Sequence, residues 1–175
     1  LCQVEFPVPS ERTAALGVPD HGWTMFGGLA HPQSRGEVRL ASTDPHVAPI
    51  VDPNMLSDPA DVEAARACVK LCRELGAAAS FAPFIAREVI PGDGNPTDDR
   101  FLRDAAVTYW HQSGTARMGR DDMAVVDGTL KVRGVEGLRV ADGSIFPTVP
   151  TGNIQAPCAI VGERAAQIIR DTYRI

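Results

Sequence analysis

Two segments of the 175-residue chain combine residue types that could carry chemistry. The first spans residues 109–119, where His111 follows two aromatic residues and leads into the small-residue turn Gln-Ser-Gly-Thr-Ala. The second reads Val-Ala-Asp-Gly-Ser-Ile-Phe-Pro over residues 140–147 and continues to Gly-Asn-Ile-Gln at 152–155. A histidine suits general-base chemistry near neutral pH because its imidazole has a reference pKa of about 6.5.

The second segment predicts a polar site at the start of a helix, just after Asn153. Backbone N–H groups and the helix dipole favour an anion or a developing negative charge at such a position. Each residue also has a structural interpretation. Asn153 could be the N-cap of the helix, Asp142 a turn residue and His111 a buried structural histidine.

Hydrolytic and metal chemistry have little support in the sequence. No Gly-x-Ser-x-Gly turn is present, and Ser113 follows His111 too closely to form a catalytic triad with it. Cys68 and Cys72 share the apolar face of a predicted helix, without a histidine or second cysteine pair at ligand spacing. We therefore expect buried thiols and no metal site. This cysteine usage favours a reducing compartment, and we expect a cytoplasmic location.

Composition narrows the class of partner. The net charge is −5 and no cluster of Lys and Arg is visible, which argues against nucleic acid. No stretch approaches the roughly 20 apolar residues of a membrane span, so no membrane partner is predicted. The chain opens Leu-Cys-Gln-Val-Glu-Phe without an initiator Met, and we expect it to belong to a longer polypeptide.

Alternating and helical patterns predict the elements that must position these residues. Strands are predicted over 1–9, 23–30, 36–42, 86–90 and 138–141, the second and third forming an antiparallel hairpin, while residues 44–53 are too rich in proline for regular structure. Helices are predicted from Ser57-Asp58-Pro59 to Gly76, over 98–106 with Thr97 or Asp98 as cap, and over 155–173. The inward residues of the first helix are Val62, Ala65, Val69, Cys72 and Leu75; those of the last are Ile160, Val161, Ala165, Ile168 and Ile169.

Several runs, in order, resemble the C-terminal region of the glucose-methanol-choline (GMC) family of oxidoreductases, which use FAD to oxidise alcohols. The resemblance extends from about Trp23 to the C-terminus. The runs are His-x-x-Gly-Thr-x-Arg-Met-Gly at 111–119, Val-Ala-Asp-Gly-Ser-Ile-Phe-Pro at 140–147, Gly-Asn-Ile-Gln-Ala at 152–156, Gly-Glu-Arg-Ala-Ala at 162–166 and Asp-Pro-Asn-Met-Leu-Ser-Asp-Pro at 52–59.

This resemblance implies an α+β fold of two parts. Residues 1–137 would be mostly the substrate-binding domain, an antiparallel sheet with helices. Residues 138–175 would return to a Rossmann-like FAD-binding domain as its last strand and helix.

The resemblance also implies roles for individual residues. His111 takes the place of the catalytic base and Asn153 that of its His or Asn partner, for hydride transfer from an alcohol CH–OH to flavin N5. Asp142, Gly143, Asn153 and Ile154 are implied to contact FAD. Tyr109 and Trp110 are expected to line the pocket of a small-molecule alcohol.

One departure from the family pattern concerns the cofactor. The Gly-x-Gly-x-x-Gly turn that binds the ADP half of FAD is absent, so the FAD site is incomplete in this chain. We expect an N-terminal FAD-binding half in another chain or removed, and no activity from the chain alone. Two alternatives stay open: a stand-alone domain that docks a partner, and a non-redox member resembling hydroxynitrile lyases.

Overall fold

The computed structural model describes residues 2–5, 10, 17, 20–92 and 98–174. The chain divides into two compact units, Leu1–Val107 and Thr108–Ile175. Both helices and antiparallel strands are present, which confirms the α+β class. The assignment of residues 1–137 and 138–175 to two domains of a complete enzyme stays a prediction.

The first unit contains two small antiparallel pairs of strands. They are β1 (Cys2–Glu5), β2 (Thr24–Gly27), β3 (Glu37–Arg39) and β4 (Ile50–Asp52). β1 pairs with β2 and β3 with β4, so the predicted hairpin between residues 23–30 and 36–42 is wrong. Alternation of apolar residues predicts a strand but does not specify its partner, which explains the error. Residues 6–9 of the predicted first strand lie outside the described residues.

The proline-rich stretch does contain a strand. Asp44 builds the turn before it, since its carboxylate accepts from the backbone N–H of His46 at 2.9 Å and its carbonyl accepts from Val47 N–H at 3.1 Å. Pro49 and Pro53 flank β4 instead of interrupting it. The expectation of irregular structure over residues 44–53 is therefore wrong for three residues, because prolines are tolerated beside a short strand.

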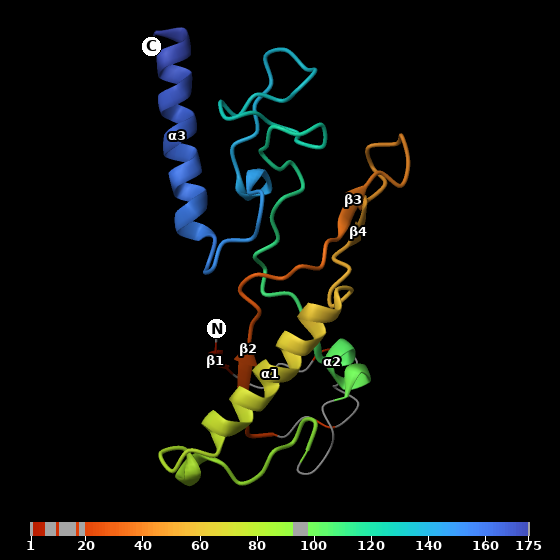
Figure 1. Ribbon diagram of the computed structural model, residues 1–175, viewed down its shortest axis with the longest axis vertical. Helices are drawn as coiled ribbons and strands as arrows, with labels where there is room; N and C mark the ends of the chain where they lie inside the picture. Colours follow the sequence, from red (N-terminus) through yellow and green to blue (C-terminus); the bar gives the residue numbers. More distant parts are fainter. Residues whose placement is uncertain (1, 6–9, 11–16, 18–19, 93–97, 175) are drawn as a thin grey trace. The chain divides into compact units, whose positions relative to one another are not determined.

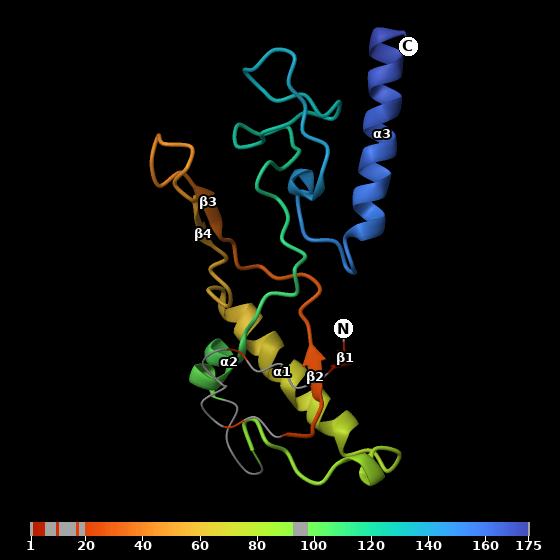
Figure 2. The same ribbon diagram turned by 180° about the vertical axis from the view of Figure 1, so that it is seen from behind.

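Helix α1 (Pro59–Gly76) begins and ends as the sequence predicts. The Asp58 carboxylate accepts from Ala60 N–H at 2.8 Å, and Pro59 takes the first helical position, where a missing N–H costs nothing. Figures 1 and 2 show α1 beside β2 and beside the short helix α2 (Asp99–Ala105), which Asp98 caps. Its inner face forms a core with residues before and after it: Leu56, Val62 and Leu102, packed against Leu29, Ala65, Val69, Phe101 and Ala106.

The cysteines of α1 face strand β2. A Cβ atom on Gly27 would lie 2.3 Å from Cys68 Sγ and 3.0 Å from Cys72 Sγ, so the strand approaches the helix closely at a residue without a side chain. Leu75, predicted to point inward, is 40% exposed instead. The helix therefore turns its last apolar residue away from the core.

The segment after α1 is less regular than predicted. A short 3-10 helix, η2 (Ala82–Phe84), is followed by turns, and no strand forms over residues 86–90. The side chain of Glu88 bonds Arg73 of α1 at 2.9 Å, while Pro91 and Gly92 form a turn.

A buried carboxylate, Asp61, ties the loop before β3 to the start of α1. Only 4% of Asp61 is exposed, and its two oxygens accept from the backbone N–H groups of Gln33 at 2.8 Å and Ser34 at 2.7 Å. The Ser34 hydroxyl donates to Asp61 as well, and accepts from Asp58 N–H at 3.1 Å. Burial on its own raises the pKa of Asp61. The hydrogen bonds from Gln33 and Ser34 outweigh it, with a smaller contribution from the charge of Arg35, and hold the pKa below its ordinary value of 3.8.

The second unit is organised around helix α3 (Gln155–Tyr173), which lies alongside the irregular segment before it (Figures 1 and 2). Its core is Val126, Leu130, Ile145 and Ala165, packed against Met118, Val132, Val140, Phe146, Val161 and Ile168. The predicted helix bounds are confirmed, but Ile160 is 69% exposed and Ile169 is 37% exposed. The stripe Val161, Ala165 and Ile168 follows the i, i+4, i+7 spacing of one helix face, and the two other isoleucines fall beside it.

The strand predicted over residues 138–141 is reduced to one bridge. Arg139 pairs antiparallel with Lys131, and the neighbouring bonds run from Val132 N–H to Leu138 O and from Val140 N–H to Leu130 O. The segment is extended and pairs with residues 130–132, but the ladder does not lengthen into a strand.

We predict that Asp61→Asn lowers the free energy of unfolding by about 2 to 3 kcal/mol, because an amide N–H would replace an acceptor that faces N–H donors. The matched control is Glu63→Gln on the same helix. Glu63 is exposed and lies 3.7 Å from Arg66, so its change should stay below about 1 kcal/mol. Urea unfolding of both variants measures the difference.

The same carboxylate sets a dependence on pH. Because the folded state lowers the pKa of Asp61, its contribution is fully present above the unfolded value and is lost as the pH falls through the folded value. Unfolding from about pH 7 down to about pH 3 should show a loss of stability below about pH 4 that is smaller in Asp61→Asn than in the parent. An identical pH profile in the variant would contradict this assignment.

Candidate functional site

All of the predicted site residues lie in the second unit, and backbone pairing joins the two segments that carry most of them. Ala116 N–H donates to Ser144 O at 3.0 Å and Met118 N–H donates to Ile145 O at 2.8 Å. Residues 116–118 therefore lie directly against residues 144–145. The residues concerned are Tyr109, Trp110, His111, Asp142, Gly143, Asn153 and Ile154.

The imidazole of His111 has a defined orientation. Its Nδ1 lies 3.1 Å from the backbone carbonyl oxygen of Trp110. A carbonyl oxygen only accepts, so Nδ1 carries the proton in this bond and Nε2 presents its lone pair when the ring is neutral. Nε2 is buried and has no hydrogen-bond partner among the described residues.

The backbone around His111 adopts an unusual conformation. Trp110 has φ 58°, in the left-handed region that costs a bulky residue about 1 kcal/mol or more. Its N–H donates to Thr108 Oγ1 at 3.0 Å, and the Gln112 side-chain amide also bonds this hydroxyl oxygen. The turn that carries His111 is thus held by one threonine side chain.

The two aromatic residues before His111 differ in burial. The Tyr109 ring meets the imidazole edge to face, with centroids 5.4 Å apart and planes at 82°, and restricts rotation of the histidine. Trp110 is 68% exposed, with its ring centroid 6.3 Å from that of Tyr109. Their assignment to a substrate pocket stays a prediction.

Asp142 and Gly143 begin the short 3-10 helix η3 (Gly143–Ile145). Asp142 Oδ1 accepts from Ser144 N–H at 2.8 Å, and the hydrogen bonds from Ser144 hold the pKa of Asp142 below its ordinary range. A Cβ atom on Gly143 would lie 3.3 Å from Cys158 Sγ and 3.5 Å from Ile154 Cδ1. The absence of a side chain at Gly143 therefore lets the loop approach the first turn of α3.

Asn153 does not cap α3. The N-cap position is Ile154, and no side chain caps the helix there. Pro157 has no N–H, and the first backbone bond of the helix runs from Cys158 N–H to Ile154 O at 2.9 Å. The first turn thus leaves the N–H groups of Gln155 and Ala156 without a capping side chain, as suits an anionic group. The implied role of Asn153 as the partner of His111 stays a prediction.

The sequence interpretation did not single out Thr108, and it considered Ser113 only as a possible triad serine. Thr108 holds the backbone of the turn, and the Ser113 hydroxyl is a second buried polar atom without a partner in the described part of the chain. Neither residue belongs to a periodic pattern. Their proximity to His111 in the sequence is the one signal that could have drawn attention to them.

Arg117 has a structural role in the same run. Its guanidinium forms two hydrogen bonds to Asp121, one of them at 2.9 Å, and this pairing holds the pKa of Asp121 well below its usual range. Both side chains lie partly in solvent. Arg117 therefore braces a local turn between residues 117 and 121.

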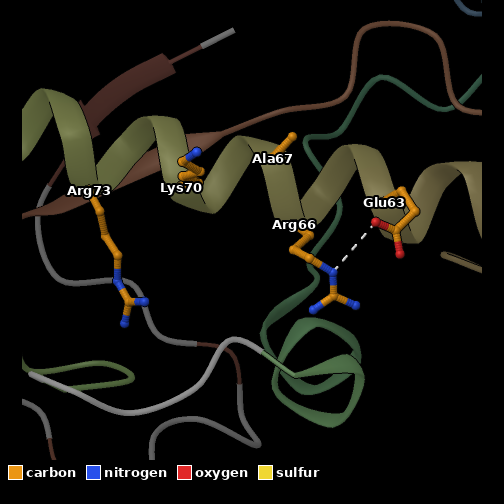
Figure 3. A pocket seen from close by; sticks show the side chains of 5 residues that line it. All are labelled: Glu63, Arg66, Ala67, Lys70 and Arg73. Atoms are coloured by element: carbon orange, nitrogen blue, oxygen red, sulfur yellow. Dashed lines mark ion pairs between the residues drawn. The ribbon is translucent and has the colours of Figure 1, made fainter.

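A hollow along one face of α1 lies in the first unit and contains none of the predicted site residues. Figure 3 shows its lining residues Glu63, Arg66, Ala67, Lys70 and Arg73, with the ion pair between Glu63 and Arg66. The cations have acidic partners: Arg66 also bonds Asp99, Lys70 lies 3.8 Å from Glu74, and Arg73 bonds Glu88. Such an ion-paired, solvent-facing surface is typical of an exposed helix face.

Metal binding and membrane crossing are two further possibilities to compare with the described residues. Across residues 20–92 and 98–174, together with the few described before them, no group of three or more metal-ligating side chains comes together. Within the same residues, every helix is too short or too polar to cross a lipid bilayer.

Comparison with known proteins identifies the family. The family model described as GMC oxidoreductase matches residues 32–162. An oxygen-dependent choline dehydrogenase of Chromohalobacter salexigens is 39% identical over 167 residues, which cover 94% of this chain and 30% of that protein. The chain thus spans about 30% of the length of this curated relative.

Two solved structures are also similar. The pyridoxine 4-oxidase of Mesorbium loti aligns with a TM-score of 0.84 and 32% identity, over 93% of this chain and 32% of that one. A formate oxidase variant of Aspergillus oryzae RIB40, studied for modification of its FAD, aligns with a TM-score of 0.78 and 31% identity, over 90% of this chain and 29% of that one. The chain belongs to the GMC oxidoreductase family.

Proposed function

We propose that the chain is the C-terminal part of an FAD-dependent oxidoreductase that oxidises a small alcohol, with His111 as the general base. The observation that carries this proposal is the orientation of His111. Its Nδ1 is bound by the Trp110 carbonyl, and its Nε2 is left as a buried acceptor without a partner among the described residues. Members of the family are FAD flavoproteins, which supplies the oxidant class.

In this proposal His111 takes the hydroxyl proton of the alcohol on Nε2. A buried acceptor without a partner costs about 1 to 3 kcal/mol, and a substrate hydroxyl that donates to it recovers that cost. The Trp110 carbonyl stabilises the imidazolium that results, because it keeps accepting from Nδ1. The Tyr109 ring limits rotation of the imidazole.

Asn153 is the proposed second contact to the substrate oxygen. Its amide donates a hydrogen bond and carries no charge, so it orients the hydroxyl without competing for the proton. Asn153 directly precedes the N-cap of α3 and is exposed, which leaves its side chain available for this contact.

The proposed FAD contacts are Asp142, Gly143, Asn153 and Ile154. Gly143 leaves room beside Ile154 and Cys158, and the first turn of α3 presents N–H groups that no side chain caps. These features fit a cofactor with an anionic edge. When bound, FAD supplies the acceptor for the hydride that leaves the alcohol carbon. The protein residues position the alcohol and hold its proton.

We predict that FAD is retained only when the rest of the longer polypeptide is present. The test measures flavin absorbance of this chain alone and of the complete polypeptide, each purified by gel filtration after addition of FAD. The expected result is stoichiometric flavin in the complete protein and none in the chain alone, because the Gly-x-Gly-x-x-Gly turn is absent from these 175 residues. Stoichiometric flavin on the chain alone, or flavin without turnover of any small alcohol in the complete protein, would overturn the proposal.

His111→Ala in the complete, FAD-loaded protein should lower kcat/KM for the alcohol by about a hundredfold to ten-thousandfold, the usual range for loss of a general base. FAD content should not change, because His111 is proposed to touch substrate and not the diphosphate. The matched control is His46→Ala, since His46 is an exposed histidine in the turn before β4. Full activity in the His111 variant would rule out its role as the base.

A double-mutant cycle tests whether His111 and Asn153 contact the same oxygen. Asn153→Ala alone should lower kcat/KM by about tenfold, the effect of one hydrogen bond. In the His111→Ala background its effect should shrink to less than about threefold, because residues that share a contact are not additive. Equal effects in both backgrounds would place the two side chains at separate sites.

A further inference from the structure

We infer that Thr108 is a positioning residue, whose hydroxyl holds Trp110 in the left-handed conformation that presents its carbonyl to His111 and so fixes the proton of the imidazole on Nδ1. The inference rests on the proposed function, because it assigns to Thr108 the orientation of the proposed base. Thr108 itself touches neither the imidazole nor a reacting atom in this arrangement.

The first step is the tautomer. A neutral imidazole donates from one nitrogen and accepts at the other. The Trp110 carbonyl oxygen, 3.1 Å from Nδ1, accepts only, and it selects the form with the proton on Nδ1. Nε2 then has the lone pair that a base needs. Without the carbonyl, either nitrogen could hold the proton, and part of the population would present N–H where a base is required.

The second step is the backbone that brings the carbonyl to this place. The bond joins His111 to the residue directly before it, so the direction of the carbonyl depends on the dihedral angles of Trp110. Its φ of 58° lies in the left-handed region, which L-residues with bulky side chains rarely adopt. Such a conformation persists where neighbouring contacts hold it.

The third step is the contact that holds it. Trp110 N–H donates to Thr108 Oγ1 at 3.0 Å, which closes a short side-chain turn over residues 108–110. Gln112, on the other side of His111, bonds the same hydroxyl through its side-chain amide. Thr108 therefore joins the residues before and after the histidine. The Trp110 ring itself adds little restraint, since it is 68% exposed and its aromatic contact among the described residues is to the adjacent Tyr109.

The first test reads the tautomer directly. In the 175-residue chain labelled with ¹⁵N-histidine, the four histidines give four pairs of ring-nitrogen signals, and His111→Gln identifies one pair. Spectra are recorded at about pH 8.5, where imidazoles near the reference pKa of about 6.5 are neutral. The parent should show His111 protonated on Nδ1. Thr108→Val should shift the ratio about fivefold toward the form protonated on Nε2, as expected for the loss of one orienting hydrogen bond.

Two variants control for folding and for the general loss of a hydroxyl. Thr108→Ser keeps the hydroxyl and should give the parent pattern. Thr172→Val removes a hydroxyl from the same unit, where Thr172 Oγ1 donates to Ile168 O at 2.7 Å, and it should leave the His111 signals unchanged. A parent-like nitrogen pattern in Thr108→Val overturns the inference.

The second test uses the complete, FAD-loaded protein. Thr108→Val should lower kcat by about tenfold to a hundredfold, the range for removal of an outer partner that orients a functional histidine. KM and FAD content should stay near the parent values, since no substrate contact is lost, and Thr108→Ser should restore the rate.

Two outcomes separate the inference from the proposed function. The positioning role is overturned if His111→Ala inactivates the enzyme while Thr108→Val shifts the nitrogen pattern and leaves the rate unchanged. If His111→Ala keeps full activity, the proposed function fails, and the nitrogen spectra still decide whether Thr108 sets the tautomer.

Discussion

Two backbone hydrogen bonds, Ala116 N–H to Ser144 O and Met118 N–H to Ile145 O, are the constraint on which the candidate site depends. They join segments about thirty residues apart, and Ile145 is itself buried in the core of the second unit. Because Ala165 of α3 packs in the same core, the helix and both segments are fixed to one apolar centre. The candidate site consists of irregular backbone, so its geometry is fixed by packing against this core and not by a helix or a strand.

Some buried polar atoms of the chain are fully hydrogen-bonded, and others have no hydrogen-bond partner in the described residues. Asp61 is buried with three donors on its carboxylate, and the result is a rigid joint between a loop and the start of α1. His111 Nε2 and Ser113 Oγ are buried without partners in the described residues. The hydrogen bonds to Asp61 stabilise the first unit. In the second unit, each of these two buried atoms without a hydrogen bond lowers the stability of the fold by about 1 to 3 kcal/mol. A cost of that kind is typical of positions kept for a ligand.

Whether an element could be predicted from the sequence depends on whether local or long-range interactions determine it. The helices α1 and α3 were predictable because Asp58, Pro59 and the apolar spacing act locally. The partner of β2 was not, since alternation carries no information on pairing, and β2 pairs with β1. His111 was singled out through its motif and stays the proposed base. The hydrogen bond of the Thr108 hydroxyl could not be predicted, because it involves a left-handed residue, Trp110, that no periodic pattern encodes.

The orientation of His111 and the retention of a cofactor depend on different parts of the protein. The contacts that orient the imidazole all come from residues 108–112, so they are complete within one short turn. The proposed cofactor contacts lie at residues 142–143 and 153–154, at the starts of η3 and α3, and the 175-residue sequence has no phosphate-binding Gly-x-Gly-x-x-Gly turn. A chain that spans about 30% of its curated relative can therefore fix the orientation of the His111 imidazole by itself. Affinity for a dinucleotide, in contrast, requires surface on both sides of the ligand.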